Sequence, residues 1–489
     1  MIFLVNSSPE FENDIRALLM AFFTGEKIST SPCSWDRHLF IDFDGERIFA
    51  RIEDAGGERL EKSTSVSPDG YRGIKDTYKT LVYELLSAFT KATLPWGTLT
   101  GVRPAKIVMG QIERGHTPEQ ARDYLIRYYL VSEEKAALCS EIAVKEKAIL
   151  DRIDYEKGYS LYVGIPFCPS ICAYCSFSSY PLSVWKDRVD EYLDALSREI
   201  RAGAKLMSGR RPLTFYMGGG TPTTLTAGQM DRVLGELEES FDFSDALEIT
   251  VEAGRPDSIT PEKLSVLRKH GIRRISINPQ SMNQETLDLI GRRHTVQDVI
   301  RAFEMAREQG FDNINMDLIA GLPGEREEHM QRTMDAVCAL RPDSITVHSL
   351  ALKRAAFLNQ NRELFPVAEA GEVNRMIAIS RQCSAQIGLS PYYLYRQKNI
   401  AGNLENVGYA REGCEGVYNI LIMEEKQTIL ALGAGASSKF VFPSPDGTSR
   451  IERVMNVKSV SDYIGRIDEM ISRKETFCSK NRVGEDGNE

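Results

Sequence analysis

The stretch LYVGIPFCPSICAYCSFSSY, residues 161–180, joins an apolar, β-like run to three closely spaced cysteines. Cys168, Cys172 and Cys175 are separated by three and then two residues. This spacing lets a single loop wrap a compact inorganic centre, and thiolates select zinc, copper(I) or iron–sulfur clusters. The sequence therefore predicts a thiolate-bound centre directly after a buried strand.

The number of ligands narrows the kind of centre. A structural zinc site usually takes four protein ligands, often from two Cys-x-x-Cys pairs, and the sequence has no second such pair. Three thiolates on a four-iron cluster leave one iron without a protein ligand, where a small molecule could chelate. The alternative is three buried structural cysteines. Their spacing within a proline-containing loop favours the cluster.

From Tyr159 to about Leu389 the chain alternates between strand-like and helix-like segments. The strand-like segments are short, apolar and rich in β-branched residues: SLYVGIPF (160–167), LTFYMGGG (213–220), LEITVEAG (247–254), RRISINPQ (273–280), NINMDLIAGL (313–322) and SITVHSL (344–350). Segments such as 186–206 and 295–310 between them repeat apolar residues every three or four positions, as helices do. The alternation predicts a parallel sheet with right-handed crossovers, either doubly wound or an incomplete barrel.

Chemically unusual residues follow these strands where each one ends. They are the three cysteines, the glycines of YMGGGTP (216–222), Glu252, Gln280 and Asp317. In open and barrel α/β folds, the carboxyl ends of the strands carry the functional site. Glycines at the second strand end let the backbone approach a ligand closely, although such a turn could also be only a tight connection. We expect one site at this mouth.

The chain divides into four predicted regions. Residues 1–155 form an α+β domain of unknown role, 156–389 the parallel core, 390–478 a small C-terminal cap over the substrate, and 479–489 a polar, disordered tail. The first domain could shape the substrate entrance, dock a redox partner or only stabilise the core.

Composition limits the protein class. A net charge of −9 gives no global support for nucleic-acid binding. No apolar run approaches the ~20 residues of a membrane span, and the N-terminus lacks a signal-peptide pattern. We expect a cytoplasmic protein with reduced thiols. Six other cysteines are isolated and predicted to be structural: Cys33, Cys139, Cys338, Cys383, Cys414 and Cys478.

The Cys-x-x-x-Cys-x-x-Cys loop together with GGGTP resembles the radical S-adenosylmethionine (SAM) superfamily. The segments YVGIPFCPSICAYCSF, GGGTPTTL, VEAGRPD, SINPQSMN, DLIAGLPGE and VHSLALKR resemble, within it, the oxygen-independent coproporphyrinogen III dehydrogenase group, called HemN-like. The segments TGVRPAKIV and YLYRQKNIAGNLENVGYA are similar to its HemZ-type branch. The resemblance implies a partial (β/α)₆ TIM-type barrel with an N-terminal α+β domain and a C-terminal cap.

The resemblance also implies roles for individual residues. Cys168, Cys172 and Cys175 would ligate a [4Fe-4S] cluster whose unique iron binds SAM. Tyr162 and Tyr174 would flank the cluster and SAM, and Gly219, Gly220 and Thr221 would line the methionine part. The remaining implied SAM contacts are Glu252, Gln280, Arg292, Asp317 and Ala351. Arg292 could clamp a carboxylate as a planar fork.

The implied activity is that of a radical SAM oxidoreductase of haem biosynthesis. It would decarboxylate coproporphyrinogen III oxidatively to protoporphyrinogen IX through a 5′-deoxyadenosyl radical, with electrons from a donor such as flavodoxin or ferredoxin. Two alternatives remain open: a haem chaperone on the same scaffold, or another radical SAM reaction on a tetrapyrrole, such as methyl transfer or ring opening. Gly164 stands where the related enzymes commonly have His, and Ser176-Phe177 where they can carry a further cysteine.

A tetracarboxylate substrate needs basic partners near the mouth. The candidates are Lys353, Arg354, Arg396 and Lys398, unless they are ordinary surface charges. His348 could be a core histidine, which we favour, or a proton donor. The segment LGAGASS, residues 432–438, could pass close to the cofactor or form a packing turn.

Overall fold

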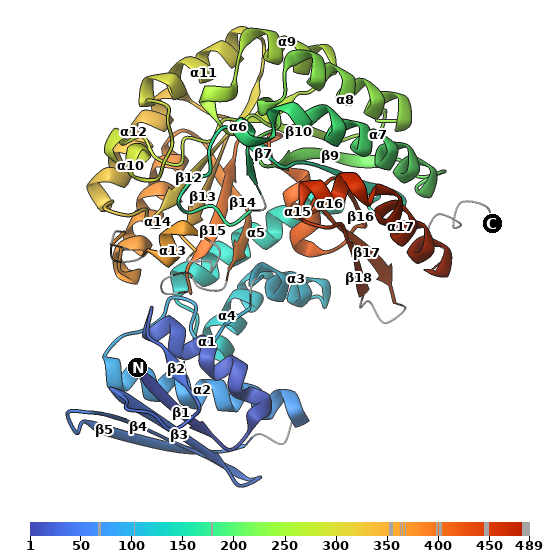
Figure 1. Cartoon of the computed structure of the whole chain (residues 1–489). Helices are drawn as coiled ribbons and strands as arrows, with labels where there is room; N and C mark the ends of the chain where they lie inside the picture. The colour runs from blue at the N-terminus through green and yellow to red at the C-terminus, as the bar shows by residue number, and fades with distance from the viewer. Residues whose placement is uncertain are drawn as a thin grey trace.

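The chain folds around two large hydrophobic cores, one within its first 94 residues and the other in the rest of the chain (Figure 1). The computed structural model describes residues 1–66, 70–101, 103–177, 179–351, 356–361, 363, 365–366, 368–397, 400, 403–444 and 449–481.

The first core lies between a small sheet and two helices. The sheet has the strand order β2-β1-β3-β4-β5, with strands β1 (Ile2–Asn6), β2 (Ile28–Ser29), β3 (Arg37–Phe43), β4 (Arg47–Asp54) and β5 (Arg59–Ser65). Every second residue of β4 is buried, the period expected of a strand with one covered face. Helices α1 (Glu12–Phe22) and α2 (Gly70–Thr90) pack against that sheet.

The second core surrounds a larger sheet, whose order across the described residues is β14-β15-β13-β12-β11-β10-β9-β6-β16-β17-β18. Its central strands are parallel: β6 (Tyr159–Ile165), β9 (Pro212–Gly219), β10 (Glu248–Glu252), β11 (Arg274–Ser276), β12 (Asn313–Ala320) and β13 (Ser344–Ser349). These correspond to the six predicted strands. The predicted α/β core with a parallel sheet is therefore confirmed.

Helices follow these strands and form an outer arc over the sheet (Figure 1). They are α7 (Val189–Leu206), α8 (Ala227–Ser240), α9 (Pro261–Lys269), α10 (Gln284–Leu289), α11 (Val296–Glu308), α12 (Glu327–Leu340) and α14 (Ala370–Gln386). Thr226, Thr260 and Thr295 fix three of the helix starts, because each hydroxyl accepts a hydrogen bond from the first-turn backbone. The caps set where each connection from strand to helix ends.

The hydrophobic core changes after Leu94, ahead of the domain boundary predicted at residue 155. Helices α3 (Ala105–Glu113), α4 (Pro118–Tyr129) and α5 (Glu133–Leu150) belong to the larger core. Two buried contacts join this helical segment to the sheet. The Trp96 indole and the Lys135 ammonium both donate to the buried Glu405 carboxylate, at 2.7 and 2.6 Å.

The region predicted as a cap extends the large sheet at both edges. Its elements are β14 (Ser390–Arg396), β15 (Glu405–Ala410), α15 (Val417–Glu424), β16 (Ile429–Leu432), β17 (Ser437–Pro443), β18 (Ser449–Met455), α16 (Val460–Gly465) and α17 (Ile467–Asn481). Strand β15 pairs antiparallel with β13, and β16 pairs parallel with β6. Helix α17 continues three residues into the segment predicted to be a disordered tail, and residues 482–489 lie outside the described residues.

A buried carboxylate ties the C-terminal helices to the core. Glu199 on α7 accepts hydrogen bonds from the Lys474 ammonium (2.7 Å), the Asn456 amide (2.8 Å), the Tyr463 hydroxyl (2.6 Å) and the Gly433 backbone (2.7 Å). The side chains of Glu199 and Lys474 are each 1% exposed. Since a buried charge is costly unless paired, this network fixes α17 against α7.

Within the described part of the chain, we found no helix that combines the length and the apolar character needed to cross a bilayer.

Candidate active site

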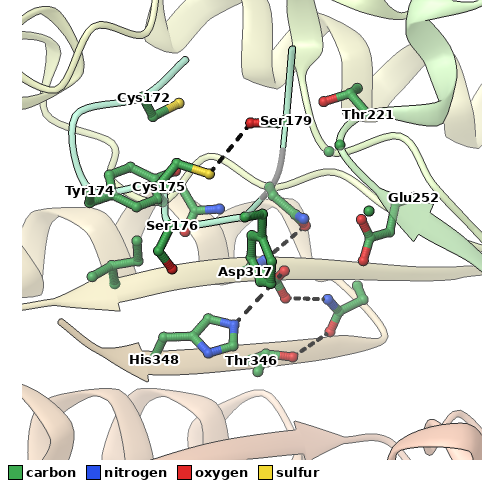
Figure 2. A pocket seen from close by; sticks show the side chains of 18 of the residues that line it. Cys172, Tyr174, Cys175, Ser176, Ser179, Thr221, Glu252, Asp317, Thr346 and His348 are labelled. Atoms are coloured by element: carbon green, nitrogen blue, oxygen red, sulfur yellow. Dashed lines mark hydrogen bonds and ion pairs between the residues drawn. The ribbon is translucent and has the colours of Figure 1, made fainter. Parts of the chain in front are cut away.

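All thirteen residues predicted from the sequence to form the site line one cavity of about 600 Å³. The cavity opens where the parallel strands end, as expected for this class of fold. Figure 2 shows the cysteine loop on one side of it and the strand residues Asp317 and His348 on the other.

The cysteine loop is held by backbone pairing at both of its ends. After β6, strand β7 (Phe167–Cys168) pairs in parallel with β8 (Tyr180–Pro181). Inside the loop, the Ala173 backbone donates to the Ile290 carbonyl at 3.0 Å. These bonds bend the loop so that its three thiols line the cavity.

The three thiols form no disulfide and face different partners. Cys168 Sγ lies 3.5 Å from the Thr221 hydroxyl, and Cys175 Sγ lies 3.9 Å from the Ser179 hydroxyl (Figure 2). Burial raises the pKa of the Cys168 thiol to about 11. Among the described residues, no three His, Cys, Asp or Glu side chains are grouped to hold one metal ion. A four-iron cluster does not need such a group, because each cysteine binds a different iron.

Arg255, which was not selected from the sequence, contacts the loop at Cys172. Its guanidinium donates to Cys172 Sγ at 3.5 Å and to the Ser170 hydroxyl at 3.2 Å. Asp257 holds the other side of the guanidinium through bonds of 2.9 and 2.8 Å. The segment VEAGRPD contains both residues, but it was noted only for its resemblance to the HemN-like group, and no role was predicted for its arginine.

At the end of β9, the backbone of two glycines, which carry no side chains, lines the cavity. Gly219 has a φ of +103°, which favours glycine. A side chain on Gly220 would come within 2.5 Å of the Phe167 carbonyl. Both glycines are therefore required for the close approach of β9 to the cysteine loop, and this approach leaves Thr221 beside Cys168.

Glu252, the last residue of β10, lies on a stack of tyrosines. It accepts a 2.6 Å hydrogen bond from Tyr216, whose ring stacks between those of Tyr162 and Tyr418 with centroids 6.4 and 4.8 Å away. Burial, partly offset by this hydrogen bond, raises the pKa of Glu252 to about 7. Tyr216 and Tyr418 were not predicted, because aromatic residues in apolar segments also fit an ordinary core.

We expect the stability of the unliganded protein to depend on pH through Glu252. Its pKa is about 7 in the folded protein, against an ordinary value of 4.5 for a solvated glutamate, so the folded protein binds the proton more tightly. Its contribution to the free energy of unfolding is therefore complete below pH 4.5, and up to about 3 kcal/mol is lost as the pH rises to 7. Glu252→Gln should remove this loss.

Urea titrations of wild type and Glu252→Gln at about pH 5 and 8 measure the difference. Glu191→Gln makes the same chemical change on the exposed surface of α7 and serves as the control. Equal pH dependence in wild type and Glu252→Gln would contradict a proton held by Glu252.

Gln280 holds an unusual backbone conformation for a non-glycine residue. Its φ is +69°, and its backbone exchanges hydrogen bonds with Asp317 and Ile319 on β12 at 3.0 and 2.9 Å. Its buried side-chain oxygen has no hydrogen-bond partner among the described residues. An unpaired buried acceptor is expensive, so this oxygen fits a ligand that donates a hydrogen bond into the cavity.

Asp317 and His348 form a polar pair on adjacent strands (Figure 2). His348 Nε2 lies 3.9 Å from the Asp317 carboxylate, and its Nδ1 lies 3.2 Å from the Tyr395 hydroxyl. Burial raises the pKa of Asp317, but His348, Asn315 and Thr346 outweigh it and hold the pKa below its usual range. His348 lines the cavity, so the favoured interpretation as a core histidine is wrong.

Arg292 is not a free carboxylate clamp. Its guanidinium donates to the Tyr174 hydroxyl at 3.0 Å and to two backbone carbonyls, those of Gly254 and Asn278. Only Nε is left without a partner among the described residues. Arg292 therefore fixes Tyr174 at the cavity wall.

Other predicted residues lie elsewhere. Arg396 is 3% exposed, donates to the carbonyls of Leu99, Gly101 and Asn403, and does not line the cavity. The other three candidate cations, Lys353, Arg354 and Lys398, lie outside the described residues. The LGAGASS segment forms a packing turn, since a side chain on Gly433 would reach the Gly164 carbonyl at 2.5 Å.

The C-terminal segment supplies an aromatic wall that was not predicted from the sequence. Tyr393 and Tyr395 of β14 line the cavity with parallel rings 6.2 Å apart, and Tyr418, Ile422 and Met423 of α15 line it as well. Tyr393 and Tyr395 stand at alternate positions of β14, which weakly indicates that both side chains lie on one face of a strand. The sequence of β14 does not indicate that this strand would join the large sheet.

Comparisons with known proteins identify the family of the chain. The family model described as the radical SAM superfamily matches residues 162–337. The chain is 43% identical to the oxygen-independent coproporphyrinogen-III oxidase-like protein HemZ of Bacillus subtilis over 86% of this chain and 85% of that protein. It is 33% identical to the heme chaperone HemW of Bacillus subtilis over 63% of this chain and 76% of that protein.

The solved structure of coproporphyrinogen III oxidase HemN from Escherichia coli is similar in fold. It matches with a TM-score of 0.52 and 26% identity, over 66% of this chain and 73% of that one. This similarity supports the predicted fold class. The chain belongs to the radical SAM superfamily and, within it, to the HemN-like group, a family that uses a [4Fe-4S] cluster and S-adenosylmethionine.

Proposed function

We propose that the protein is a radical SAM oxidoreductase that decarboxylates two propionates of coproporphyrinogen III to give protoporphyrinogen IX without O₂. The observation that carries this proposal is one cavity lined on one side by the cysteine loop and on the other by Tyr393, Tyr395 and Tyr418. Flat aromatic rings suit the faces of a macrocycle, and the cavity brings it beside the cofactor. The similarity to HemZ over most of both chains supports the same reaction class.

The proposed cofactor roles are those that the resemblance to the family implies, and the lining of the cavity by all of these residues supports them. Cys168, Cys172 and Cys175 hold the cluster and leave one iron to SAM. Gly219, Gly220 and Thr221 lie beside its methionine part. Glu252, Gln280 and Asp317 supply oxygens for hydroxyl or ammonium donors of SAM, and Ala351 contacts it. Tyr162 and Tyr174 flank the cofactors, with Arg292 acting through Tyr174.

When bound, the cluster and SAM supply a carbon-centred radical that can take a hydrogen atom from an unactivated C–H bond. The aromatic wall and the tyrosine stack exclude water from this step, which protects a reactive species. His348 lies between Asp317 and Tyr395, where Nε2 can hold a proton near a substrate carboxylate. We further propose a flavodoxin or ferredoxin as electron donor, and the cytoplasm as the compartment.

A haem chaperone is the second candidate. The match with HemW over 76% of that protein favours it, and so do the two departures in the sequence, Gly164 and Ser176. A carrier needs the same cavity but no decarboxylation. The two functions therefore differ in their products and not in the architecture of the site.

Anaerobic incubation of the cluster-loaded protein with SAM, a reductant and coproporphyrinogen III separates the two. We expect product masses lower by one and then two CO₂ with the accompanying hydrogens, and none of these products with Cys172→Ala. Stoichiometric haem binding with an unchanged substrate mass would establish the carrier instead. An altered mass without CO₂ loss would indicate a different tetrapyrrole reaction.

A further inference from the structure

An ion pair between the buried Arg255 and the partly exposed Asp257 lies directly behind the cysteine loop and has no part in the proposed contacts to SAM or substrate. The side chain of Arg255 is 4% exposed and that of Asp257 is 25% exposed. The guanidinium donates to Cys172 Sγ at 3.5 Å, to Ser170 at 3.2 Å, and to both oxygens of Asp257. A buried cation thus faces one of the three cysteine sulfurs.

The three sulfurs are not equivalent in this respect. Cys168 faces the Thr221 hydroxyl and Cys175 the Ser179 hydroxyl, whereas Cys172 faces a guanidinium. Hydrogen bonds to the sulfurs and nearby charge set the reduction potential of iron–sulfur clusters. Reduction adds a negative charge to the cluster, so a cation at Cys172 favours the reduced form, and the carboxylate of Asp257 opposes it.

We propose that Arg255 is a positioning residue that raises the reduction potential of the cluster through Cys172, and that Asp257 both orients the guanidinium and limits its effect. The inference rests on the proposed ligand role of Cys172. It does not depend on which tetrapyrrole reaction follows, because both candidate functions share the cluster.

The directions in which two substitutions shift the midpoint potential of the cluster test the proposal. Arg255→Gln removes the cation and should lower the midpoint potential, so that the ratio of reduced to oxidised cluster at a fixed potential falls about tenfold, or ~59 mV for one electron. Asp257→Asn leaves the guanidinium without its counter-charge and should shift the potential in the opposite direction. A role limited to holding the loop in place would move both variants the same way.

The measurement is a redox titration of the cluster by electron paramagnetic resonance, with iron and sulfide content determined on the same samples. A pH above about 7.5 keeps His294 neutral, since burial lowers its pKa and it lies 3.7 Å from Asp257. Arg232→Gln, the same change in an exposed ion pair on α8, is the control and should leave the potential unchanged.

Opposite shifts in the two variants support the proposal. Equal potentials in wild type and a fully loaded Arg255→Gln overturn it, and so do shifts of the same sign in both variants. If Arg255→Gln holds no cluster, Asp257→Asn decides alone: a higher potential supports the proposal, and an unchanged or lower one overturns it. Loss of the cluster in Cys172→Ala is a separate measurement, and it tests whether Cys172 is a ligand of the cluster.

Discussion

Cys172→Ala is expected to lose the cluster, its visible absorbance and its SAM binding. Losing even an outer partner of a metal ligand typically weakens metal binding about 10–100-fold, so removing a ligand itself should weaken it by more than about a hundredfold. Cys172 is 7% exposed and is the middle one of the three cysteines in the loop, so alanine removes one of the three proposed ligands and leaves only Cys168 and Cys175. Iron and sulfide analysis of anaerobically reconstituted protein measures the effect, together with SAM binding.

Cys33→Ala is the matched control, because Cys33 is a free cysteine near the small N-terminal sheet and does not line the cavity. It should retain wild-type iron content. Full iron and an unchanged spectrum in Cys172→Ala would show that the loop does not hold the cluster through this residue, and the ligand assignment would have to be abandoned.

Glu199→Gln is expected to destabilise the protein by about 3–5 kcal/mol, the usual cost of breaking a buried ion pair from one side. The substitution leaves the ammonium of Lys474 uncompensated at 1% exposure. It also weakens the acceptor for Tyr463 and Gly433. Urea titrations followed by far-UV circular dichroism should show a lower transition midpoint.

Two further variants test whether the uncompensated charge of Lys474 causes this loss of stability. Glu236→Gln removes a carboxylate that pairs with the exposed Arg201, and it should cost no more than about 1 kcal/mol. Adding Lys474→Met to Glu199→Gln removes the orphaned charge and should restore part of the loss. A wild-type midpoint for Glu199→Gln would mean that the network does not anchor α17.

The parallel core and its mouth could be predicted because both follow from local pattern. Apolar β-branched runs separated by amphipathic helices leave few topologies, and in those the strand ends meet. Glu252 at the end of β10 and Asp317 near the end of β12 therefore reach the same cavity as the cysteines. The order of the strands alone was enough to predict that these residues share one cavity.

Contacts between distant segments could not be predicted in this way. Trp96 and Glu405 are 309 residues apart, and no local pattern indicates that α3 to α5 would pack on the larger core. The contacts of Arg292 could not be predicted for a related reason. Its charge suggested a ligand, but its actual partners are backbone carbonyls and Tyr174, which only the folded chain places around it.

The position of β16 beside β6 has a consequence for biosynthesis. Ser160 hydrogen-bonds Gln427 across 267 residues, and β16 follows immediately to pair with the strand that leads into the cysteines. On the ribosome, a nascent chain therefore carries β6 with one unpaired edge until residues 429–432 have been translated. A translation product that ends before residue 429 therefore lacks β16, the strand that pairs with β6 directly before the cysteine loop.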